Sequence, residues 1–139
     1  MLKNYVISLA HHSKRQSHIQ QEFAKQHIPF TFFSAVTPDK NTQVAQRLAI
    51  DITKSVSSDT EIACFLSHAS LWQHCVDENL DYIGIYEDDI FLGQQFEQLI
   101  RQIDVLQSQA IDILKLEKVS PRVHLAHPIV LPQSKRTIY

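Results

Sequence analysis

Three adjacent carboxylates, Glu87, Asp88 and Asp89, follow an apolar run in the segment IYEDDIFL. Neighbouring carboxylates repel one another, and a divalent cation removes that conflict. Carboxylate and water oxygens are the ligands that Mg²⁺ and Mn²⁺ prefer. Residues two apart on an extended backbone point to the same side, so Glu87 and Asp89 are predicted to face one ligand and Asp88 to point away. The alternative is a solvated acidic loop, because charge runs are normally exposed.

The triplet lies where a parallel sheet would collect a ligand. Residues 4–9 and 30–36 are strand candidates, and residues 14–27 between them have helical apolar spacing. Strand, helix and strand with short links predict a βαβ unit, and therefore an α/β fold with a mainly parallel sheet flanked by helices. A further strand is expected to begin at Asp81 and to end at the triplet. Ligands bind at the carboxyl ends of such strands.

The clearest helix signal spans residues 58–79. Ser58 and Glu61 form a capping-box pattern at its start. Apolar side chains recur at three- and four-residue spacing and predict one buried stripe, made of Ile62, Phe65, Leu66, Ala69, Trp72 and Val76. His68 falls on the flank of that stripe, near Cys75. A half-buried helix histidine with a hydrogen-bond partner is the plain interpretation of this position.

The remaining segments are less regular. Residues 37–57 are expected to cross the surface with a single turn of helix. Residues 94–107 place apolar side chains on one helical face, and residues 110–118 are a strand candidate. Residues 119–139, which contain three prolines, receive no assignment. The length of the chain favours a single domain over residues 1–139.

Composition excludes several classes of protein. The chain has 139 residues, a net charge of −2 and no basic stripe that would bind nucleic acid. It has only two glycines and no Gly-rich phosphate loop. No apolar segment is long enough to span a membrane and the start lacks a secretory signal, so a cytoplasmic location is expected. Cys64 and Cys75 would lie about 16 Å apart on one helix and are expected to be free thiols.

Five segments, taken together and in order, resemble glycosyltransferase family 25. This family comprises bacterial lipooligosaccharide glycosyltransferases and includes the procollagen galactosyltransferases. The segments are YVISL followed by Lys14–Arg15, FSAV, EIACFLSHASLW, IYEDDIFL and DILKL, and they span residues 3–117. The resemblance implies a GT-A-like fold. It also implies transfer of a hexose, galactose or glucose, from a UDP-sugar to a lipooligosaccharide or lipopolysaccharide glycan acceptor.

The resemblance assigns roles to the triplet. In this family the EDD sequence would be a DXD-like element that holds Mn²⁺, or Mg²⁺, against the donor diphosphate. The ion would stabilise the charge that develops on the departing UDP. Asp89 is expected to bind the metal and Glu87 to bind the metal or the ribose. Asp88 is expected to orient the loop on the donor side.

The resemblance places four further residues near the donor. Ser8 and Leu9, at the end of the first strand, would lie near the uracil, and Arg15 would approach the donor. His68 would contact the donor or support the site through another side chain. The implied partners are a UDP-sugar and a glycan acceptor, and peripheral association with the cytosolic face of the inner membrane is expected.

Family members generally continue into a second half that carries much of the acceptor site. The resemblance therefore predicts that residues 1–139 hold the N-terminal donor-binding portion, truncated at its C-terminus, and no general base is named. Two other interpretations stay open. A non-catalytic relic or nucleotide-binding module would keep the fold without transfer. A response-regulator receiver has a similar length, but its acidic pair follows the first strand, which here ends in Ser8, Leu9 and Ala10.

Overall fold

A computed structural model describes four parts of the chain, residues 2–105, 112–116, 129–130 and 137–138. The chain divides into two compact units, Met1–Glu97 and Gln98–Tyr139. All of the residues for which a role at the site is expected belong to the first unit. Within the described residues, no helix is both long enough and apolar enough to cross a bilayer.

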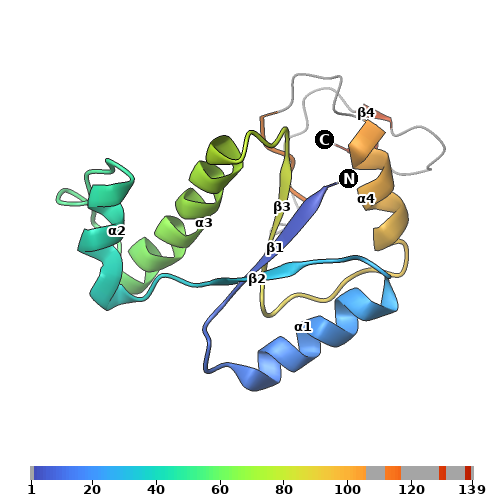
Figure 1. Cartoon of the computed structure of the whole chain (residues 1–139), viewed down its shortest axis with the longest axis horizontal. Helices are drawn as coiled ribbons and strands as arrows, with labels where there is room; N and C mark the ends of the chain where they lie inside the picture. Colours follow the sequence, from blue (N-terminus) through green and yellow to red (C-terminus); the bar gives the residue numbers. More distant parts are fainter. Residues whose placement is uncertain (1, 106–111, 117–128, 131–136, 139) are drawn as a thin grey trace. The chain divides into compact units, whose positions relative to one another are not determined.

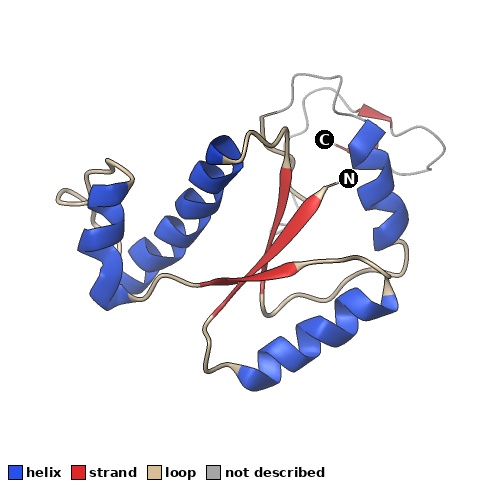
Figure 2. Ribbon diagram, viewed as in Figure 1, coloured by secondary structure: helices blue, strands red, loops and turns tan. Residues whose placement is uncertain are grey.

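The first unit is built on a three-stranded parallel sheet with the strand order β2-β1-β3 (Figure 1, Figure 2). The strands are β1 Lys3–Ser8, β2 Thr31–Ser34 and β3 Ile83–Glu87. Ser8 pairs with Ser34, and Ile7 pairs with Glu87. The predicted α/β fold with a parallel sheet flanked by helices is confirmed, and the acidic triplet lies at the carboxyl edge of this sheet.

Helices α1 (Ser13–Lys25) and α3 (Asp59–Asp77) pack on opposite faces of the sheet (Figure 2). The 3₁₀ turn η1 (Pro38–Lys40) and the helix α2 (Asn41–Arg47) pack against α3. The Phe23 ring of α1 lies 5.3 Å from the Tyr86 ring of β3. On the other face, the Tyr5 hydroxyl hydrogen-bonds to Nε2 of His74 in α3 at 2.9 Å. Successive side chains of a strand point to opposite faces of the sheet. Neighbouring residues of one strand therefore contact different helices.

The segment between β2 and α3 contains more helix than the sequence indicated. The turn η1 and the helix α2 stand where a single turn was expected, so that expectation was too low. Val44 and Ala45 of α2 are buried together with Leu66 of α3. Nη2 of Arg47 donates to the Ser70 hydroxyl at 3.2 Å. This segment is therefore packed against α3, which fixes the position of that helix.

Helix α3 begins at the predicted capping box, because Ser58 and Glu61 each satisfy an amide of the other. The predicted apolar stripe is partly wrong, since Phe65, Trp72 and Val76 are 46%, 47% and 72% exposed. The buried face keeps Leu66 and Ala69 of the predicted stripe and is completed by Ala63, Ser67, Ser70 and Leu71. Ser67 and Ser70 can be buried because each hydroxyl donates to the helix carbonyl four residues earlier.

The C-terminal elements were only partly predicted. The expected helix after the triplet is present as α4 (Phe96–Val105), which begins two residues later than predicted, and residues 106–107 lie outside the described residues. The strand predicted over residues 110–118 is not found at residues 112–116, and the rest of that segment lies outside the described residues. In the tail that received no assignment, β4 (Ile129–Val130) pairs antiparallel with β5 (Thr137–Ile138).

Candidate functional site

The candidate site lies at the carboxyl edge of the sheet, where β3 ends at Glu87 and a turn follows. Two groups of side chains meet there. The Asp88 cluster comprises Ser8, Arg15, Asp88 and Asp89, and its helical member comes from α1. The Glu87 cluster comprises Cys64, His68 and Glu87, and its helical members come from α3. Glu87 and Asp88, which are consecutive in sequence, therefore belong to two different clusters.

Asp88 is the buried centre of its cluster, with a side chain that is 9% exposed. The Ser8 hydroxyl donates to its Oδ2 at 2.7 Å, and Nη1 of Arg15 donates to its Oδ1 at 2.9 Å. Burial by itself would raise the pKa of Asp88. The hydrogen bonds from Ser8 and Arg15 and the charge of Arg15 outweigh burial and lower that pKa below its ordinary value. Asp88 is therefore held as a carboxylate with both oxygens engaged.

Arg15 links the buried carboxylate to the exposed one. Its Nη1 lies 2.9 Å from Asp88 and 3.6 Å from Oδ2 of Asp89. The hydrogen bond to Asp88 is the main reason that the pKa of Arg15 is raised. The Arg15 side chain is 52% exposed and the Asp89 side chain 58% exposed. A guanidinium has five N–H donors, so Arg15 has donors left for an anion at the sheet edge.

Polar contacts fix the loop between β1 and α1. Nε2 of Gln16 donates to the Leu9 carbonyl at 3.2 Å and to the Ser8 hydroxyl at 3.4 Å. The His12 amide donates to the same Leu9 carbonyl at 3.0 Å, and its ring Nδ1 lies 3.7 Å from Asp88. These contacts hold the first turn of α1, and therefore Arg15, beside the end of β1.

The segment after the acidic turn is also tied to α1. A ring nitrogen of His18 hydrogen-bonds to the Ile90 carbonyl at 2.8 Å. The Leu92 amide donates to the Glu22 carboxylate at 3.0 Å. Both ends of the Asp88–Asp89 turn are thus held, one by β3 and the other by α1.

The Glu87 cluster is more open. Nε2 of His68 lies 3.3 Å from Oε1 of Glu87, and the Cys64 thiol donates to the same oxygen at 3.8 Å. The Glu87 side chain is 52% exposed. Partial burial, followed by the Glu87 charge and hydrogen bond, raises the pKa of Cys64 above its ordinary value. The thiol is therefore protonated, and it contributes a weak donor to this cluster.

The structure corrects one expectation for the triplet. Glu87 and Asp89 were predicted to face the same side, but Glu87 contacts His68 of α3 and Asp89 lies near Arg15 of α1. The alternation of an extended strand applies only as far as Glu87, because Asp88 and Asp89 form a turn. Among the other expected residues, Ser8 and Arg15 do meet the triplet, whereas Leu9 contributes its carbonyl to the supporting loop.

Sequence reasoning missed three residues at this edge, namely His12, Gln16 and Cys64. Cys64 precedes His68 by four residues, and such spacing places both on one helical face. That signal was available. His68 also lies beside Trp72, with ring centroids 6.4 Å apart. The contacts of His12 and Gln16 depend on where the β1–α1 loop turns, and no sequence pattern gives that position.

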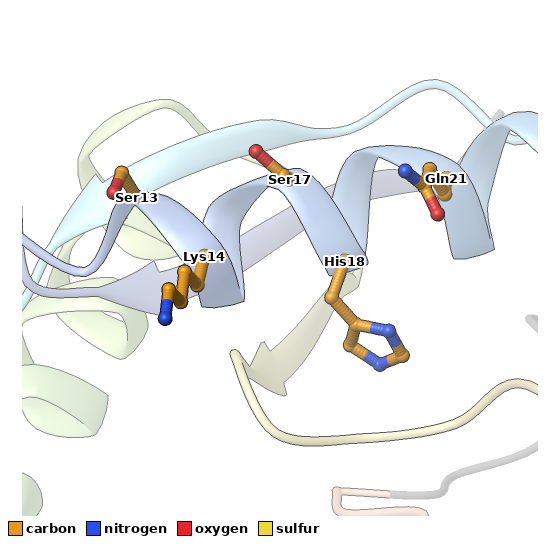
Figure 3. Close-up of a pocket in the computed structure, with 5 residues that line it drawn as sticks. All are labelled: Ser13, Lys14, Ser17, His18 and Gln21. Atoms are coloured by element: carbon orange, nitrogen blue, oxygen red, sulfur yellow. The ribbon is translucent and has the colours of Figure 1, made fainter.

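A separate hollow lies along α1, lined by Ser13, Lys14, Ser17, His18 and Gln21 (Figure 3). All of its lining residues belong to α1, it is open to solvent, and none of the residues expected at the site lines it. The sheet edge is the better candidate because it gathers charged groups from separate elements.

Comparison with known proteins identifies the relatives of this chain. Residues 1–133 match the description "Glycosyltransferase family 25 (LPS biosynthesis protein)". One Haemophilus influenzae relative is 48% identical over 117 residues, which are 82% of this chain and 41% of that protein. The H. influenzae "Lipooligosaccharide biosynthesis protein lic2B" is 41% identical over 105 residues, 75% of this chain and 40% of that protein. "Lacto-N-neotetraose biosynthesis glycosyltransferase LgtE" of Neisseria meningitidis is 33% identical over 142 residues, which cover 98% of this chain and 51% of that protein. The chain thus spans about half or less of the length of these relatives.

Proposed function

Because the chain belongs to glycosyltransferase family 25, we propose that it is the donor-binding portion of a hexosyltransferase. The donor is a UDP-sugar carrying galactose or glucose, and the acceptor is a lipooligosaccharide or lipopolysaccharide glycan. One observation carries the proposal more than any other. Ser8 and Arg15 hold the Asp88–Asp89 turn at the carboxyl edge of a parallel sheet, which is where α/β folds bind ligands.

The chemistry of the exposed carboxylate fits Mn²⁺ or Mg²⁺. Asp89 is more than half exposed, and its carboxylate is a hard oxygen ligand of the kind that these ions take. Glu87 faces α3, so in this proposal it approaches the ion, or else the donor ribose, from the other side of the turn, and it is similarly exposed. Asp88 is not proposed as a ligand because both of its oxygens already accept hydrogen bonds. A bound ion would supply Lewis-acid stabilisation of the leaving diphosphate.

The other side chains of the edge position the donor and balance its charge. Arg15 is half exposed, is held in place by Asp88, and directs unused donors toward a diphosphate. Ser8 fixes Asp88 rather than the donor itself, and the Leu9 carbonyl marks the end of β1 nearest to the proposed uracil position. His68 supports Glu87 by a contact of 3.3 Å. The geometry thus favours the supporting role over direct donor contact for His68.

The acceptor and the cellular location are proposed from the relatives. The name of one relative refers to lipooligosaccharide biosynthesis and that of another to lacto-N-neotetraose biosynthesis. A glycan attached to lipid is presented at a membrane surface, so we place the protein in the cytoplasm, in peripheral contact with the inner membrane.

The donor proposal is tested by calorimetric titration of the chain with UDP-galactose, UDP-glucose and GDP-mannose, each with Mn²⁺. We expect the two UDP-sugars to bind and GDP-mannose to bind at least about tenfold more weakly, a difference of about 1.4 kcal/mol. Arg15→Gln should weaken binding of the UDP-sugars, whereas Lys14→Gln, on the adjacent exposed position, should not. Absence of binding by all three donors would favour the non-catalytic relic.

A further inference from the structure

We propose that the Glu87 cluster is a binding site for a thiophilic divalent cation, with Zn²⁺ as the expected occupant. Cys64, His68 and Glu87 offer one sulfur, one imidazole nitrogen and one carboxylate oxygen. These three atoms lie within 4.8 Å of one another. Thiolate and imidazole ligands select Zn²⁺ over Mg²⁺ or Ca²⁺. The site requires no nucleotide, and Glu87 is the one residue that it shares with the proposed donor site.

The separations of the ligand atoms suit tetrahedral coordination. Zn–N and Zn–O bonds of about 2.0 Å and Zn–S bonds of about 2.3 Å place nitrogen and oxygen about 3.3 Å apart, and sulfur and oxygen about 3.5 Å apart. The distance from His68 Nε2 to Glu87 Oε1 is 3.3 Å, and that from Cys64 Sγ to the same oxygen is 3.8 Å. The Cys64 sulfur and the His68 nitrogen lie within 4.8 Å of each other, against about 3.5 Å in a tetrahedral site, so the Cys64 side chain rotates toward the ion on binding.

The fold holds the ligands in place before a cation arrives. Cys64 and His68 are four residues apart, which sets them on one face of α3. Between them, the Ser67 hydroxyl accepts a hydrogen bond from the Val36 amide at 2.8 Å and donates to the Ala63 carbonyl at 2.9 Å. Ser67 thereby anchors this turn of α3 to the chain after β2. Because little ordering is needed, little binding free energy is lost to it.

The cluster leaves a fourth position open to solvent. Cys64 is exposed and the His68 side chain is 29% exposed, so a water molecule can complete the coordination. On binding, the Cys64 sulfur forms a bond to the cation and its proton passes to solvent. The hydrogen bond from Cys64 to Glu87 is then replaced by coordination of both groups to the same ion.

The chain provides its own reporter and its own control. Trp72, the single tryptophan, lies with its ring centroid 6.4 Å from that of His68. A paramagnetic ion in the cluster should therefore quench tryptophan fluorescence. The second cysteine, Cys75, donates to the Leu80 carbonyl at 3.2 Å and is absent from the cluster. Cys75→Ser is thus the matched control for Cys64→Ser.

The test is a titration of the reduced full chain with Co²⁺, an absorbing substitute for Zn²⁺, in the absence of nucleotide. We expect a thiolate-to-cobalt absorption band together with Trp72 quenching, and we expect Zn²⁺ to abolish both. Cys75→Ser should retain the band and Cys64→Ser should lose it. His68→Gln and Glu87→Gln should each weaken Co²⁺ binding by about tenfold or more, whereas His11→Gln, at an exposed site, should not.

Two results would overturn the proposal. One is a parent chain without a thiolate-to-cobalt band at saturating Co²⁺. The other is a band that disappears in Cys75→Ser but persists in Cys64→Ser. Circular dichroism of each variant establishes that the fold is retained. Glu87 is common to both proposals, but the cobalt band depends on Cys64 and UDP binding is measured separately with Arg15→Gln, so the failure of one proposal is distinguished from the failure of the other.

Discussion

Glu87 and Asp88 are consecutive residues at one strand end, and their side chains meet opposite environments. Asp88 turns toward α1, where it is buried and accepts hydrogen bonds from a serine and an arginine. Glu87 turns toward α3, where it is half exposed and touches a histidine and a thiol at longer distances. The carboxylate of Asp88 thus has its hydrogen-bonding capacity satisfied, whereas that of Glu87 remains accessible to a ligand.

This difference indicates that one carboxylate of the acidic motif stabilises the fold, whereas an exposed one is free to bind a ligand. A carboxylate with two short charge-assisted or hydroxyl hydrogen bonds is costly to disturb, because its loss leaves the partners unsatisfied. An exposed carboxylate with weak contacts costs little to redirect toward a ligand. Asp88 therefore holds the two strand ends and α1 together, and its neighbours Glu87 and Asp89 are the residues that we propose for binding.

The largest effect is expected from Asp88→Ala, which should lower the free energy of unfolding by about 3 kcal/mol. The substitution removes the acceptor of the Ser8 and Arg15 hydrogen bonds in a buried position. Urea unfolding followed by circular dichroism measures it. Asp89→Ala is the control and should change stability by less than about 0.5 kcal/mol, because Asp89 is exposed. Equal losses in the two variants would contradict the comparison.

The next effect is expected from Gly84→Ala in β3, the strand that ends at Glu87 and leads into Asp88. A Cβ at this position would lie 2.5 Å from Oδ1 of buried Asn4 and 2.7 Å from the Tyr86 hydroxyl. Because these groups are hydrogen-bonded to each other at 3.0 Å, they have little room to move. We expect a loss of about 2 kcal/mol in unfolding free energy. Gly93→Ala, where nothing lies within 4 Å, should be nearly neutral.

The comparison also predicts a pH dependence that belongs to Asp88. The folded state lowers its pKa, so its contribution is fully present above the unfolded pKa of about 3.9 and is lost as pH falls through the folded value. The stability advantage of the parent over Asp88→Asn should therefore be constant near neutral pH and shrink below about pH 4. Unfolding titrations of both proteins across this range measure the difference. An advantage that grew on acidification would contradict the ionised state of Asp88.

The smallest effect is expected from Glu87→Gln, which should change the free energy of unfolding by less than about 0.5 kcal/mol in metal-free buffer. Its contacts with His68 and Cys64 are exposed and long. The same urea titration measures this change, with Asp88→Asn as the sensitive counterpart. A loss from Glu87→Gln as large as that from Asp88→Asn would show that both carboxylates are structural.

The parts of the site that depend on regular periodicity were predictable. Strand, helix and strand with short links indicated the parallel sheet, and the sheet brought Ser8 and Asp88 to one edge. The capping box at Ser58 gave the start of α3, because its two hydrogen bonds are local in sequence. Local patterns thus gave the scaffold on which the site is built.

Features that depend on where periodicity stops were not predictable. Asp89 lies on the α1 side because the strand ends at Glu87 and a turn follows. No sequence pattern marks that strand end. The buried face of α3 was misassigned because serine is polar, whereas Ser67 and Ser70 satisfy their hydroxyls within the helix. Phe65 and Trp72 were consequently expected inside and are exposed. Tertiary packing decided both cases.

The central proposal for this protein is a donor site formed at the acidic turn with a divalent ion. The decisive measurement is the thermal unfolding midpoint of the parent and of Asp89→Ala, each with UDP alone, Mn²⁺ alone, both and neither. We predict that the parent is stabilised substantially only when UDP and Mn²⁺ are both present, by mass-action linkage, and that Asp89→Ala loses this response while keeping its own midpoint. An equal response to UDP and Mn²⁺ in Asp89→Ala, or none in the parent, would contradict the central claim.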